Sequence, residues 1–477
     1  MTNIEEKKSE TRFRHSLESQ AAFAELSGDF NPVHLSPELA RRTLFGQVVV
    51  HGVHNVLRSL EVFLKNRPLR VDRLAVTFKN PVFLNEDVSM ALSDETDTSA
   101  LLTLRCGGAD AAGIRLVGHV QDSSARAPSL GHPEFPRQPT GKTLQQLENE
   151  DGVIDLAGDA TAINKAFPQC VQALGIDGVA RLLGLTRLVG MSCPGLHSMF
   201  SGFDVSFSAD RSSAPTRYRV VRADDRVSMI GISVEGGGMQ GNVAAFVRPA
   251  PVDQPDMVAV QQRVNGAPYQ GLRALVVGGS RGLGEVSAKI IAAGGGDVAI
   301  SYLSGHNDAI RIATDISRAG GTCRILQMDV SDPASSINAL GNDGWMPTHL
   351  LYFATPRISA RKPDEADTCV TRQFSDVYST GLEKVVAALR ARSNEPLTIF
   401  YPSSIYVVEG PADLTEYAAA KTAGETTARG LAKNDAGINV IIERLPPLAT
   451  DQTASLLDIT IDEPLEVMAH VLSKALC

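Results

Sequence analysis

Short apolar runs alternate with longer amphipathic stretches in the C-terminal part of the chain. The first run covers residues 272–277, and it is followed by a glycine-rich turn, an amphipathic stretch at 285–293 and a second run at 298–302. Four further runs, ILQMDV, HLLYFAT, LTIFYPSS and INVIIERLP, continue this alternation. Strands that alternate with helices of about ten to fifteen residues predict repeated βαβ units. We therefore expect an α/β fold whose doubly wound parallel sheet is covered on both faces.

The pattern before residue 250 is different, because apolar and polar residues alternate there with a period of two. Residues 70–83 and 216–236 show this alternation, and each stretch follows a segment with helical periodicity. Each segment therefore predicts a helix packed on an antiparallel sheet, an α+β arrangement. We interpret two polar, proline-containing stretches, 121–142 and 248–270, as linkers. The expected domains are 1–128, 143–250 and 268–477.

Composition and charge restrict the class of protein. The 477 residues are 43% hydrophobic and 21% charged, with a mean hydropathy of -0.03, which is typical of a globular protein with sizeable cores. A net charge of -9 argues against a nucleic-acid or anionic-membrane partner, because both require a basic surface. The apolar stretch 48–64 is interrupted by His51, His54, Arg58 and Glu61 and predicts a buried helix, not a membrane span. The six cysteines show no CxxC pairing and the charged N-terminus is no signal segment, so we expect a cytoplasmic protein.

A glycine-rich turn follows the first apolar run of the C-terminal segment. Glycines allow a positive φ and a close approach of backbone to ligand, and the N–H groups that begin the next helix attract phosphate. We expect this turn to hold the pyrophosphate of a dinucleotide; ordinary turns also contain such clusters. The turn consists of Gly278, Gly279, Ser280, Arg281, Gly282, Leu283 and Gly284.

Residues near the second apolar run favour NADP(H) over NAD(H). NAD sites usually place an acidic residue there to bind the ribose 2′-hydroxyl, whereas this chain has Ser301 and Tyr302. Arg281, inside the glycine turn, offers a guanidinium for the 2′-phosphate. The alternative for Arg281 is a solvated surface charge.

Three residues further along predict hydride-transfer chemistry. Tyr417 and Lys421 are four residues apart and share one face of a predicted helix, and Ser404 ends an apolar run. We expect the ammonium to lower the pKa of the phenol toward neutrality, so that Tyr417 gives a proton to a carbonyl oxygen as hydride arrives. Ser404 is expected to hold the same oxygen by a hydrogen bond. A YxxxK pair also occurs by chance, and it is the combination with the serine and the glycine turn that favours this interpretation.

This combination resembles the short-chain dehydrogenases/reductases (SDR). Gly278, Gly282 and Gly284 match the glycines of the family's TGxxxGxG motif, and the resemblance implies a Rossmann domain, NADP(H) as cofactor and Ser404, Tyr417 and Lys421 as catalytic residues. By the same resemblance Asp329 contacts adenine and Thr450 belongs to the segment that closes over the nicotinamide. The residues expected to bind the cofactor are Gly278, Ser280, Arg281, Gly282, Leu283, Gly284, Ser301, Asp329, Ala354, Tyr417, Lys421 and Thr450.

The chain departs from the SDR pattern at three places. Val277 replaces the threonine of the glycine motif, and residues 352–355 read Tyr-Phe-Ala-Thr where the family usually has NNAG. Tyr378 stands where an asparagine commonly holds a proton-relay water. These departures put the relay in doubt and leave the hydride-transfer residues in place.

The string FAELSGDFNPVHLSPELA near the N-terminus contains a carboxylate and an imidazole, Asp29 and His34, in a turn between two short predicted helices. Two such groups that converge on one water can take a proton from it and deliver another to carbon. That is the chemistry of adding or removing water across a double bond conjugated to a carbonyl. An aspartate and a histidine in a loop are also common as caps and turn residues.

The complete string resembles the motif of the MaoC-like, (R)-specific enoyl-thioester hydratases, which have hot-dog folds. The resemblance implies that Asp29 and His34 are catalytic and that Gly52, in VVVHGV, presents its N–H to the thioester oxygen. Residues 143–250 resemble a second, degenerate hot-dog repeat without the Asp/His motif, which would widen the acyl tunnel. His34, His51 and His54 form no HExxH motif and no dense cluster, so we expect no metal site.

These features predict a bifunctional enzyme with a double hot-dog followed by a Rossmann domain. The C-terminal domain is expected to reduce a 3-oxoacyl thioester of acyl-carrier protein (ACP) or coenzyme A with NADPH. The N-terminal domains are expected to dehydrate the resulting (R)-3-hydroxyacyl thioester to the 2-enoyl thioester. The alternative is that only one domain is catalytically active and the other is an acyl- or nucleotide-binding or scaffold module. We expect no nucleic-acid or membrane partner, and by resemblance a homodimer.

Overall fold

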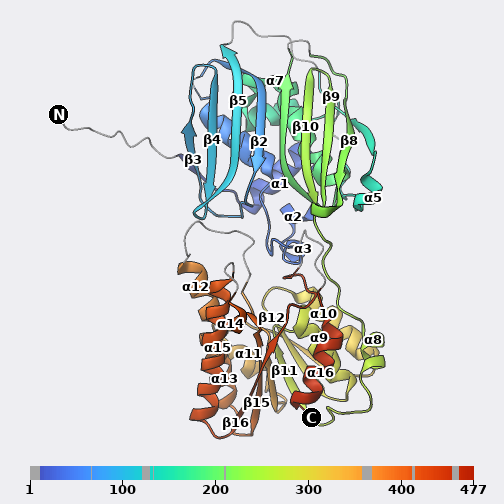
Figure 1. The fold of residues 1–477 in the computed structure, drawn as a ribbon, viewed down its shortest axis with the longest axis vertical. Helices are drawn as coiled ribbons and strands as arrows, with labels where there is room; N and C mark the ends of the chain where they lie inside the picture. The colour runs from blue at the N-terminus through green and yellow to red at the C-terminus, as the bar shows by residue number, and fades with distance from the viewer. Residues whose placement is uncertain are drawn as a thin grey trace, which may run out of the picture. The chain divides into compact units, whose positions relative to one another are not determined.

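The computed structural model describes residues 11–65, 67–120, 129–132, 134–208, 211–356, 368–410, 414–453 and 461–476. The chain divides into two compact units, the first built on residues up to Ala250 and the second on residues from Pro251 onward. The first unit contains an antiparallel sheet and the second a parallel sheet (Figure 1). No helix in the described part of the chain is both long enough and apolar enough to cross a bilayer.

The first unit is built on one ten-stranded sheet with the order β1-β3-β4-β5-β2-β7-β10-β9-β8-β6, and every pairing is antiparallel. One half of the sheet comprises β1 (Thr11–Phe13), β2 (Leu69–Phe78), β3 (Val88–Ser93), β4 (Ser99–Cys106) and β5 (Ala109–Val120). The other half comprises β6 (Asp151–Ile154), β7 (Ser198–Phe207), β8 (Thr216–Asp224), β9 (Met229–Gly236) and β10 (Met239–Val247). The period-two alternation at 70–83 and 216–236 coincides with β2, β8 and β9 of this sheet.

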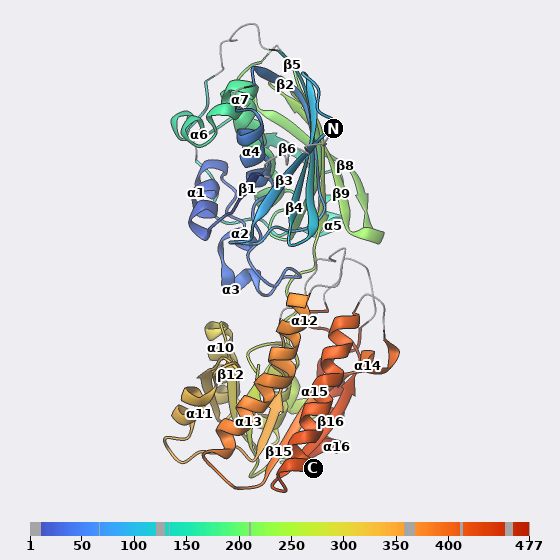
Figure 2. The ribbon, with the colours of Figure 1, turned by 90° about the vertical axis from the view of Figure 1, so that its left-hand side faces the viewer.

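The two halves meet at β2 and β7, which pair from Arg73↔Ser206 to Thr77↔Gly202. Each half packs a long helix against the sheet, α4 (Gly52–Phe63) in the first and α7 (Pro168–Arg187) in the second. Figure 2 shows both helices on one side of the sheet. One apolar cluster contains residues of both helices and both halves, so the two halves share a single core.

The helix α4 is the buried helix that the sequence predicts for 48–64. Its inward face repeats at positions i, i+3, i+4 and i+7, the spacing of one helical stripe, and these side chains are completely buried: Val53, Val56, Leu57 and Leu60. The other helices of the unit are α1 (Leu17–Ser27), α2 (Pro32–Leu35), α3 (Pro37–Ala40), α5 (Leu144–Leu147) and α6 (Ala160–Ala166), with a π-helical turn η1 (Leu188–Ser192) directly after α7 and a 3-10 turn η2 (Asp225–Val227).

The second unit has a six-stranded parallel sheet with the order β13-β12-β11-β14-β15-β16, which is the strand order 3-2-1-4-5-6 of the Rossmann fold. The strands are β11 (Arg273–Val277), β12 (Asp297–Tyr302), β13 (Cys323–Gln327), β14 (His349–Tyr352), β15 (Leu397–Ser404) and β16 (Ile438–Leu445). The helical segments are α8 (Met257–Arg263), α9 (Gly282–Ala293), α10 (His306–Arg318), α11 (Ala334–Leu340), α12 (Thr368–Ser375), η3 (Asp376–Gly381), α13 (Leu382–Arg390), α14 (Tyr406–Glu409), α15 (Thr415–Asn434) and α16 (Pro464–Leu476).

Strand β11 is buried on both faces, as the continuous apolar run predicts. Ala274 and Val276 pack into one core cluster with residues of α8, α9, α10 and α16. Leu275 and Val277 pack into a second cluster with residues of α11, α13 and α15. Because neighbouring side chains of a strand point to opposite faces, the two clusters lie on opposite sides of the sheet. The expected cover on both faces is confirmed.

The stretch 248–270 is only partly the linker that its polar composition predicts. It contains helix α8, whose Met257 and Val260 are buried in the second unit beside α9 and α16. A side chain of Asp256 caps this helix by accepting a hydrogen bond from the Ala259 N–H. The linker interpretation is wrong for this helix, because two apolar side chains are enough to hold one short amphipathic turn on a core.

A buried ion cluster joins α8, α9 and α10 in the second unit. The ammonium of Lys289 is only 1% exposed, and it lies 2.9 Å from a Glu285 oxygen, 3.0 Å from an Asp315 oxygen and 2.8 Å from the Pro255 carbonyl oxygen. The guanidinium of Arg311 donates two hydrogen bonds of 3.0 Å to the same Glu285 carboxylate. Each buried charge therefore has a partner of opposite sign, which burial of ions requires.

We expect Lys289→Met to lower the free energy of unfolding of the second unit by about 3 kcal/mol, because it keeps the side-chain volume but takes one of two cations from the buried Glu285 carboxylate and the ammonium from the partly exposed Asp315. Trp345, the single tryptophan of the chain, is buried in this unit and reports its urea unfolding by fluorescence. The matched control is Arg263→Ala, which breaks an exposed ion pair with Glu466 and is expected to cost less than about 1 kcal/mol. Equal effects of both substitutions would contradict the prediction.

Candidate active sites

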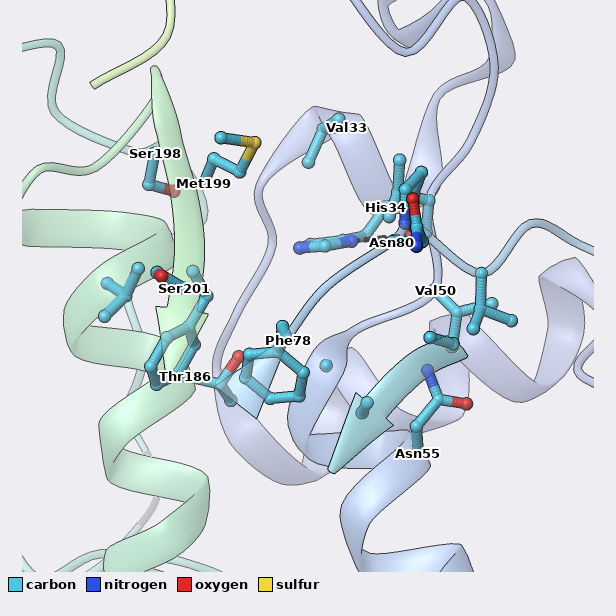
Figure 3. Close-up of a pocket in the computed structure, with 18 of the residues that line it drawn as sticks. Val33, His34, Val50, Asn55, Phe78, Asn80, Thr186, Ser198, Met199 and Ser201 are labelled. Carbon is cyan, nitrogen blue, oxygen red and sulfur yellow. Dashed lines mark hydrogen bonds between the residues drawn. The ribbon is translucent and has the colours of Figure 1, made fainter. Parts of the chain in front are cut away.

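A cavity of about 180 Å³ lies in the first unit and is lined by both halves of the sheet. Its wall is mostly apolar, and His34, Phe78 and Thr186 face the same space in Figure 3. Apolar pockets with a few convergent polar groups are the usual form of a small-molecule site. Its aromatic and sulfur-containing lining residues are Phe45, Phe78, Met199, Phe200 and Phe246.

Asp29 lies in the turn between α1 and α2 and reaches this cavity with a side chain that is 1% exposed. Gly28 ends α1 with a φ of 75°, a left-handed conformation that glycine adopts without strain, and Asn31 caps α2. One Asp29 oxygen accepts a hydrogen bond of 3.2 Å from the Asn31 N–H, and the other accepts one of 2.7 Å from the Thr186 hydroxyl. Burial raises the pKa of the Asp29 carboxyl.

His34 lies on α2 itself, one turn after Asp29, not in the loop before it. Its Nδ1 is 2.7 Å from the carbonyl oxygen of Val49, so this nitrogen donates its proton and Nε2 carries the lone pair. Burial lowers the pKa of the imidazole. The structure thus brings together the two residues that the sequence pairs, and it leaves a basic ring nitrogen beside a buried carboxyl.

His51 belongs to the same cluster, which the sequence does not predict. Ligand atoms of Asp29, His34 and His51 lie within 4.8 Å of one another, so the expectation that no dense cluster exists is wrong. The rings of His34 and His51 stack with centroids 3.9 Å apart. An oxygen atom lies beside each ring nitrogen of His51. Nδ1 is 2.7 Å from the Gln20 Oε1, and Nε2 is 3.0 Å from the Asp29 carbonyl oxygen. Each ring nitrogen of His51 therefore faces a protein oxygen, and the neutral ring donates a hydrogen bond to one of the two. We propose no metal here.

Gly52 is the first residue of α4 and lines the cavity. Among the described residues its N–H has no hydrogen-bond partner, so it is placed to donate to a ligand in the cavity. A Cβ at this position would lie 2.7 Å from the ring of Phe78, closer than van der Waals contact allows. Only glycine therefore fits between the helix and the ring.

Two residues of this site escape sequence analysis. Thr186 is separated from Asp29 by 157 residues and stands in an apolar helical stretch, where a threonine carries no signal. Gly190, in η1, is needed because a Cβ there would lie 2.1 Å from an Asp29 oxygen. Neither contact follows from spacing or composition, because both depend on how the two halves pack.

The glycine turn of the second unit joins β11 to α9. Gly278 and Gly282 have φ values of 77° and 56°, and a Cβ on Gly284 would lie 2.3 Å from the Gly278 carbonyl oxygen. No side chain caps the N-terminus of α9. A tight glycine turn in front of an uncapped helix fits a phosphate group, because it offers N–H groups and the positive end of the helix dipole.

The other residues expected to bind a cofactor lie at the C-terminal edge of this sheet. Ser301 is buried, and its hydroxyl oxygen accepts a hydrogen bond of 3.2 Å from the Gly278 N–H. Arg281 lies 3.9 Å from a carboxylate oxygen of Asp451. Asp329 accepts a 2.8 Å hydrogen bond from the Ser331 N–H. Four more lie near or within the turn: Ser280 is buried, Leu283 packs on the core, Ala354 borders Gly278 and Thr450 borders Gly282.

The structure brings Ser404, Tyr417 and Lys421 together at the same edge. Ser404 ends β15, and Tyr417 and Lys421 lie one turn apart on α15. The Ser404 side chain lies close enough to the Tyr417 phenol to act on its pKa, and the Lys421 ammonium is 5.9 Å from the centre of the Tyr417 ring. The spacing of the three residues in the sequence predicts this arrangement.

The expectation that the pKa of the Tyr417 phenol falls toward neutrality is wrong. Burial raises the pKa of Tyr417 to about 12, and burial lowers the pKa of Lys421 to about 7. The ammonium donates a 2.9 Å hydrogen bond to the Pro402 carbonyl oxygen and lies 4.2 Å above the ring of Tyr378, closer than to Tyr417. Tyr378, where the relay asparagine is expected, donates to or accepts from the Thr355 hydroxyl at 2.7 Å.

The buried imidazoles of the first unit predict a loss of stability in acid. Burial lowers the pKa of His15 to about 4 and also lowers the pKa of His34, His51 and His54. These rings stay neutral in the folded unit, whereas the unfolded chain protonates them below about pH 6.5. The free energy of unfolding therefore falls as the pH falls from about 6.5 toward 4, by up to about 1.4 kcal/mol per pH unit for each ring. Asp29, with its raised pKa, acts in the opposite direction through a single carboxyl.

Calorimetry of the intact chain at a series of pH values checks this prediction. The transition of the first unit should move to lower temperature through this window, and His54→Gln should make the dependence shallower. A transition that does not move between pH 6.5 and 4.5 would refute it.

Comparisons with known proteins agree with both predicted resemblances. Residues 2–100 match the family model of the MaoC like domain, and residues 273–462 match that of the short chain dehydrogenases. The (R)-specific enoyl-CoA hydratase of Aeromonas caviae is 40% identical over 74 residues, which are 14% of this chain and 54% of the hydratase.

Two relatives match the C-terminal segment. The 3-oxoacyl-[acyl-carrier-protein] reductase of Chlamydia pneumoniae is 28% identical over 203 residues, which are 39% of this chain and 78% of that protein. The chloroplastic NADPH-dependent aldehyde reductase-like protein of Arabidopsis thaliana is 27% identical over 197 residues, 38% of this chain and 73% of that protein. The chain therefore joins a MaoC-like domain at its N-terminus to a short-chain dehydrogenase domain at its C-terminus.

Proposed function

We propose that the chain is a bifunctional enzyme that reduces a 3-oxoacyl thioester with NADPH and then dehydrates the (R)-3-hydroxyacyl product. The observation that carries the proposal is that one chain holds two separate proton-transfer sites, each beside the feature that its reaction requires. Asp29 and His34 converge on an apolar cavity, and Tyr417 lies beside Ser404 at the sheet edge that bears the glycine turn. The two steps are consecutive, so that fusion raises the effective concentration of the intermediate.

We assign the hot-dog fold to both halves of the first unit, with domains at 1–128 and 143–250 and the reductase at 268–477. The assignment is supported by the arrangement in each half, in which one long helix packs on an antiparallel sheet. The pairing of β2 with β7 supports a double hot-dog with one continuous sheet.

The second unit carries the reduction. When bound, NADPH would supply a hydride for C3 of the 3-oxoacyl group, and the C3 oxygen would take a proton, which gives a 3-hydroxyacyl thioester and NADP⁺. Tyr417 gives this proton from its phenol, and Ser404 holds the same C3 oxygen by a hydrogen bond. When its side chain is protonated, Lys421 stabilises the phenolate that remains on Tyr417. The residues proposed to hold NADP(H) are Gly278, Ser280, Arg281, Gly282, Leu283, Gly284, Ser301, Asp329, Ala354, Tyr417, Lys421 and Thr450.

NADP(H) is preferred to NAD(H) for two reasons. Strand β12 ends in Ser301 and Tyr302, so that no carboxylate of that strand end repels a 2′-phosphate. Arg281 directly precedes α9 and offers its guanidinium, which a 2′-phosphate would draw away from Asp451. The name of the Arabidopsis relative agrees with this preference.

The first unit carries the dehydration. A proton leaves C2 and the hydroxyl leaves C3 with a second proton, so that water and the 2-enoyl thioester result. Asp29 and His34 together hold one exchangeable proton: one group takes the C2 proton on an unprotonated atom while the other gives its proton to the hydroxyl. Gly52 donates its N–H to the thioester oxygen, where negative charge develops as the C2 proton leaves. The acyl group is carried by ACP or coenzyme A.

Two substitutions test the two sites separately. When the chain is mixed with NADPH and a 3-oxoacyl thioester, the nicotinamide absorbance should fall and the enoyl absorbance should then rise. Asp29→Asn should reduce the second signal by a factor of about 10² to 10⁴ and spare the first, and Tyr417→Phe should reduce the first by a similar factor. With a 3-hydroxyacyl thioester as substrate, Tyr417→Phe should keep full dehydration.

Each outcome of this assay decides one assignment. NADPH oxidation that survives in Tyr417→Phe would remove Tyr417 from its role, and enoyl formation that survives in Asp29→Asn would do the same for Asp29. If the unsubstituted chain gives only one signal, the alternative with one active domain and one binding domain is correct.

The lowered pKa of Lys421 predicts a pH dependence of the reduction. kcat/KM for NADPH, which reports on the enzyme before the cofactor binds, should fall above about pH 7, because Lys421 loses its proton there. Lys421→Arg keeps the positive charge at all these pH values and should flatten this decline, although the rate itself is lower. The matched control is Lys433→Arg, an exposed lysine near the end of the same helix, and it should keep the decline. A decline that persists in Lys421→Arg would show that another group causes it.

A further inference from the structure

One hydrogen bond of the first unit links the half that lacks the Asp/His motif to the half that has it. The Thr186 hydroxyl on α7 donates to an Asp29 oxygen at 2.7 Å, and both side chains are at most 3% exposed. A hydroxyl within a helix commonly donates to the carbonyl of the preceding turn. Here the Thr186 hydroxyl donates instead to the carboxylate of Asp29, which is 157 residues away in the sequence.

We propose that Thr186 is a positioning residue of the dehydratase site, and that its hydroxyl orients the Asp29 carboxylate and biases the proton shared with His34 toward the imidazole. The proposal rests on the function proposed for Asp29 and His34. It gives the second half of the unit a part in the reaction beyond that of lining an acyl cavity.

The need for a donor follows from the burial of Asp29. Removal of a carboxylate from water disfavours its ionised form, and this is the main cause of the raised pKa of Asp29. The charge interaction with His34 acts in the opposite direction, followed by the hydrogen bonds from the Thr186 hydroxyl and the Asn31 N–H. A short O–H···O⁻ bond is of the charge-assisted kind, which is stronger than a bond between neutral groups. Thr186 therefore favours the anionic form of Asp29 over its protonated form.

The charged and titratable groups around Asp29 do not replace this bond. His34 shares the cavity, and the Nε2 atom of His51 lies 3.9 Å from the same oxygen that Thr186 contacts. The guanidinium of Arg187 attracts the carboxylate, but its own hydrogen bonds go to the carbonyl oxygens of Ser27 and Asp155. Thr186 is thus the side chain that donates directly to the carboxylate.

The segment after Thr186 also fits the turn that carries Asp29. The absence of a side chain at Gly190 leaves room for the second Asp29 oxygen, from which a Cβ would be only 2.1 Å away. The side-chain amide of Asn31 donates to the carbonyl oxygens of Gly190 and Gly195, at 2.8 and 3.1 Å. The second half thus fixes the turn at both of its ends, and Thr186 fixes the carboxylate itself.

Three variants of the chain test the proposal. The assay measures the hydration of a 2-enoyl-CoA as the loss of the enoyl absorbance. Thr186→Val keeps the shape and removes the hydroxyl; kcat/KM should fall by about tenfold or more and the pH profile should move to higher pH by about one unit. Thr186→Ser restores the hydroxyl and should recover most of the rate and the original profile. Thr43→Val is the matched control, because it removes a buried hydroxyl that donates to Ala40 in the same unit outside the cavity.

The outcomes separate this inference from the function on which it rests. An active unsubstituted chain whose Thr186→Val variant keeps the original profile, with or without a lower rate, would overturn the role of Thr186 and leave the dehydratase in place. A Thr186→Ser variant as impaired as Thr186→Val would also overturn it. An unsubstituted chain that hydrates no enoyl thioester, short or long, would overturn the proposed function and this inference together.

Discussion

A carboxylate that is taken out of water needs hydrogen-bond donors, and at Asp29 this requirement joins the two halves of the first unit. One donor is local, the N–H of Asn31, and the other is the Thr186 hydroxyl from the opposite half. The second donor reaches Asp29 only because β2 and β7 pair and place α7 on the same side of the sheet as α4. Continuity of the sheet is therefore a condition for the geometry of the site as well as for the core.

Burial acts on the second unit in a comparable way but with a different result. The Lys421 ammonium is held at 2.9 Å by a backbone carbonyl and lies over the ring of Tyr378, and burial lowers its pKa to about 7. A cation with such a pKa gains or loses its proton near neutrality, so that it is suited to respond to a phenol that gives up a proton nearby. In the first unit a buried carboxyl lies beside an imidazole, whereas in the second a buried amine lies near a phenol.

Much of the molecule could be predicted from local patterns. The apolar runs predict the parallel sheet because a strand covered on both faces has no polar face, and Ala274 to Val277 divide between two core clusters accordingly. Tyr417 and Lys421 could be paired from their spacing, since four residues make one helical turn. Asp29, His34 and Gly52 could be named because the string around them resembles a known motif, and the structure brings all three to one cavity.

The sequence by itself thus determined the strand and helix types, the two families and the side chains that we propose to react, because these depend on periodicity and on residues close together in the chain. The tertiary structure alone decided the partners from distant segments and the electrostatic state of each group. Thr186 and Gly190 meet Asp29 through packing of one half on the other, and His51 joins the cluster through the stacking of its ring. The pKa of Tyr417 rises instead of falling, because burial, which no spacing reveals, outweighs a cation that is bonded elsewhere.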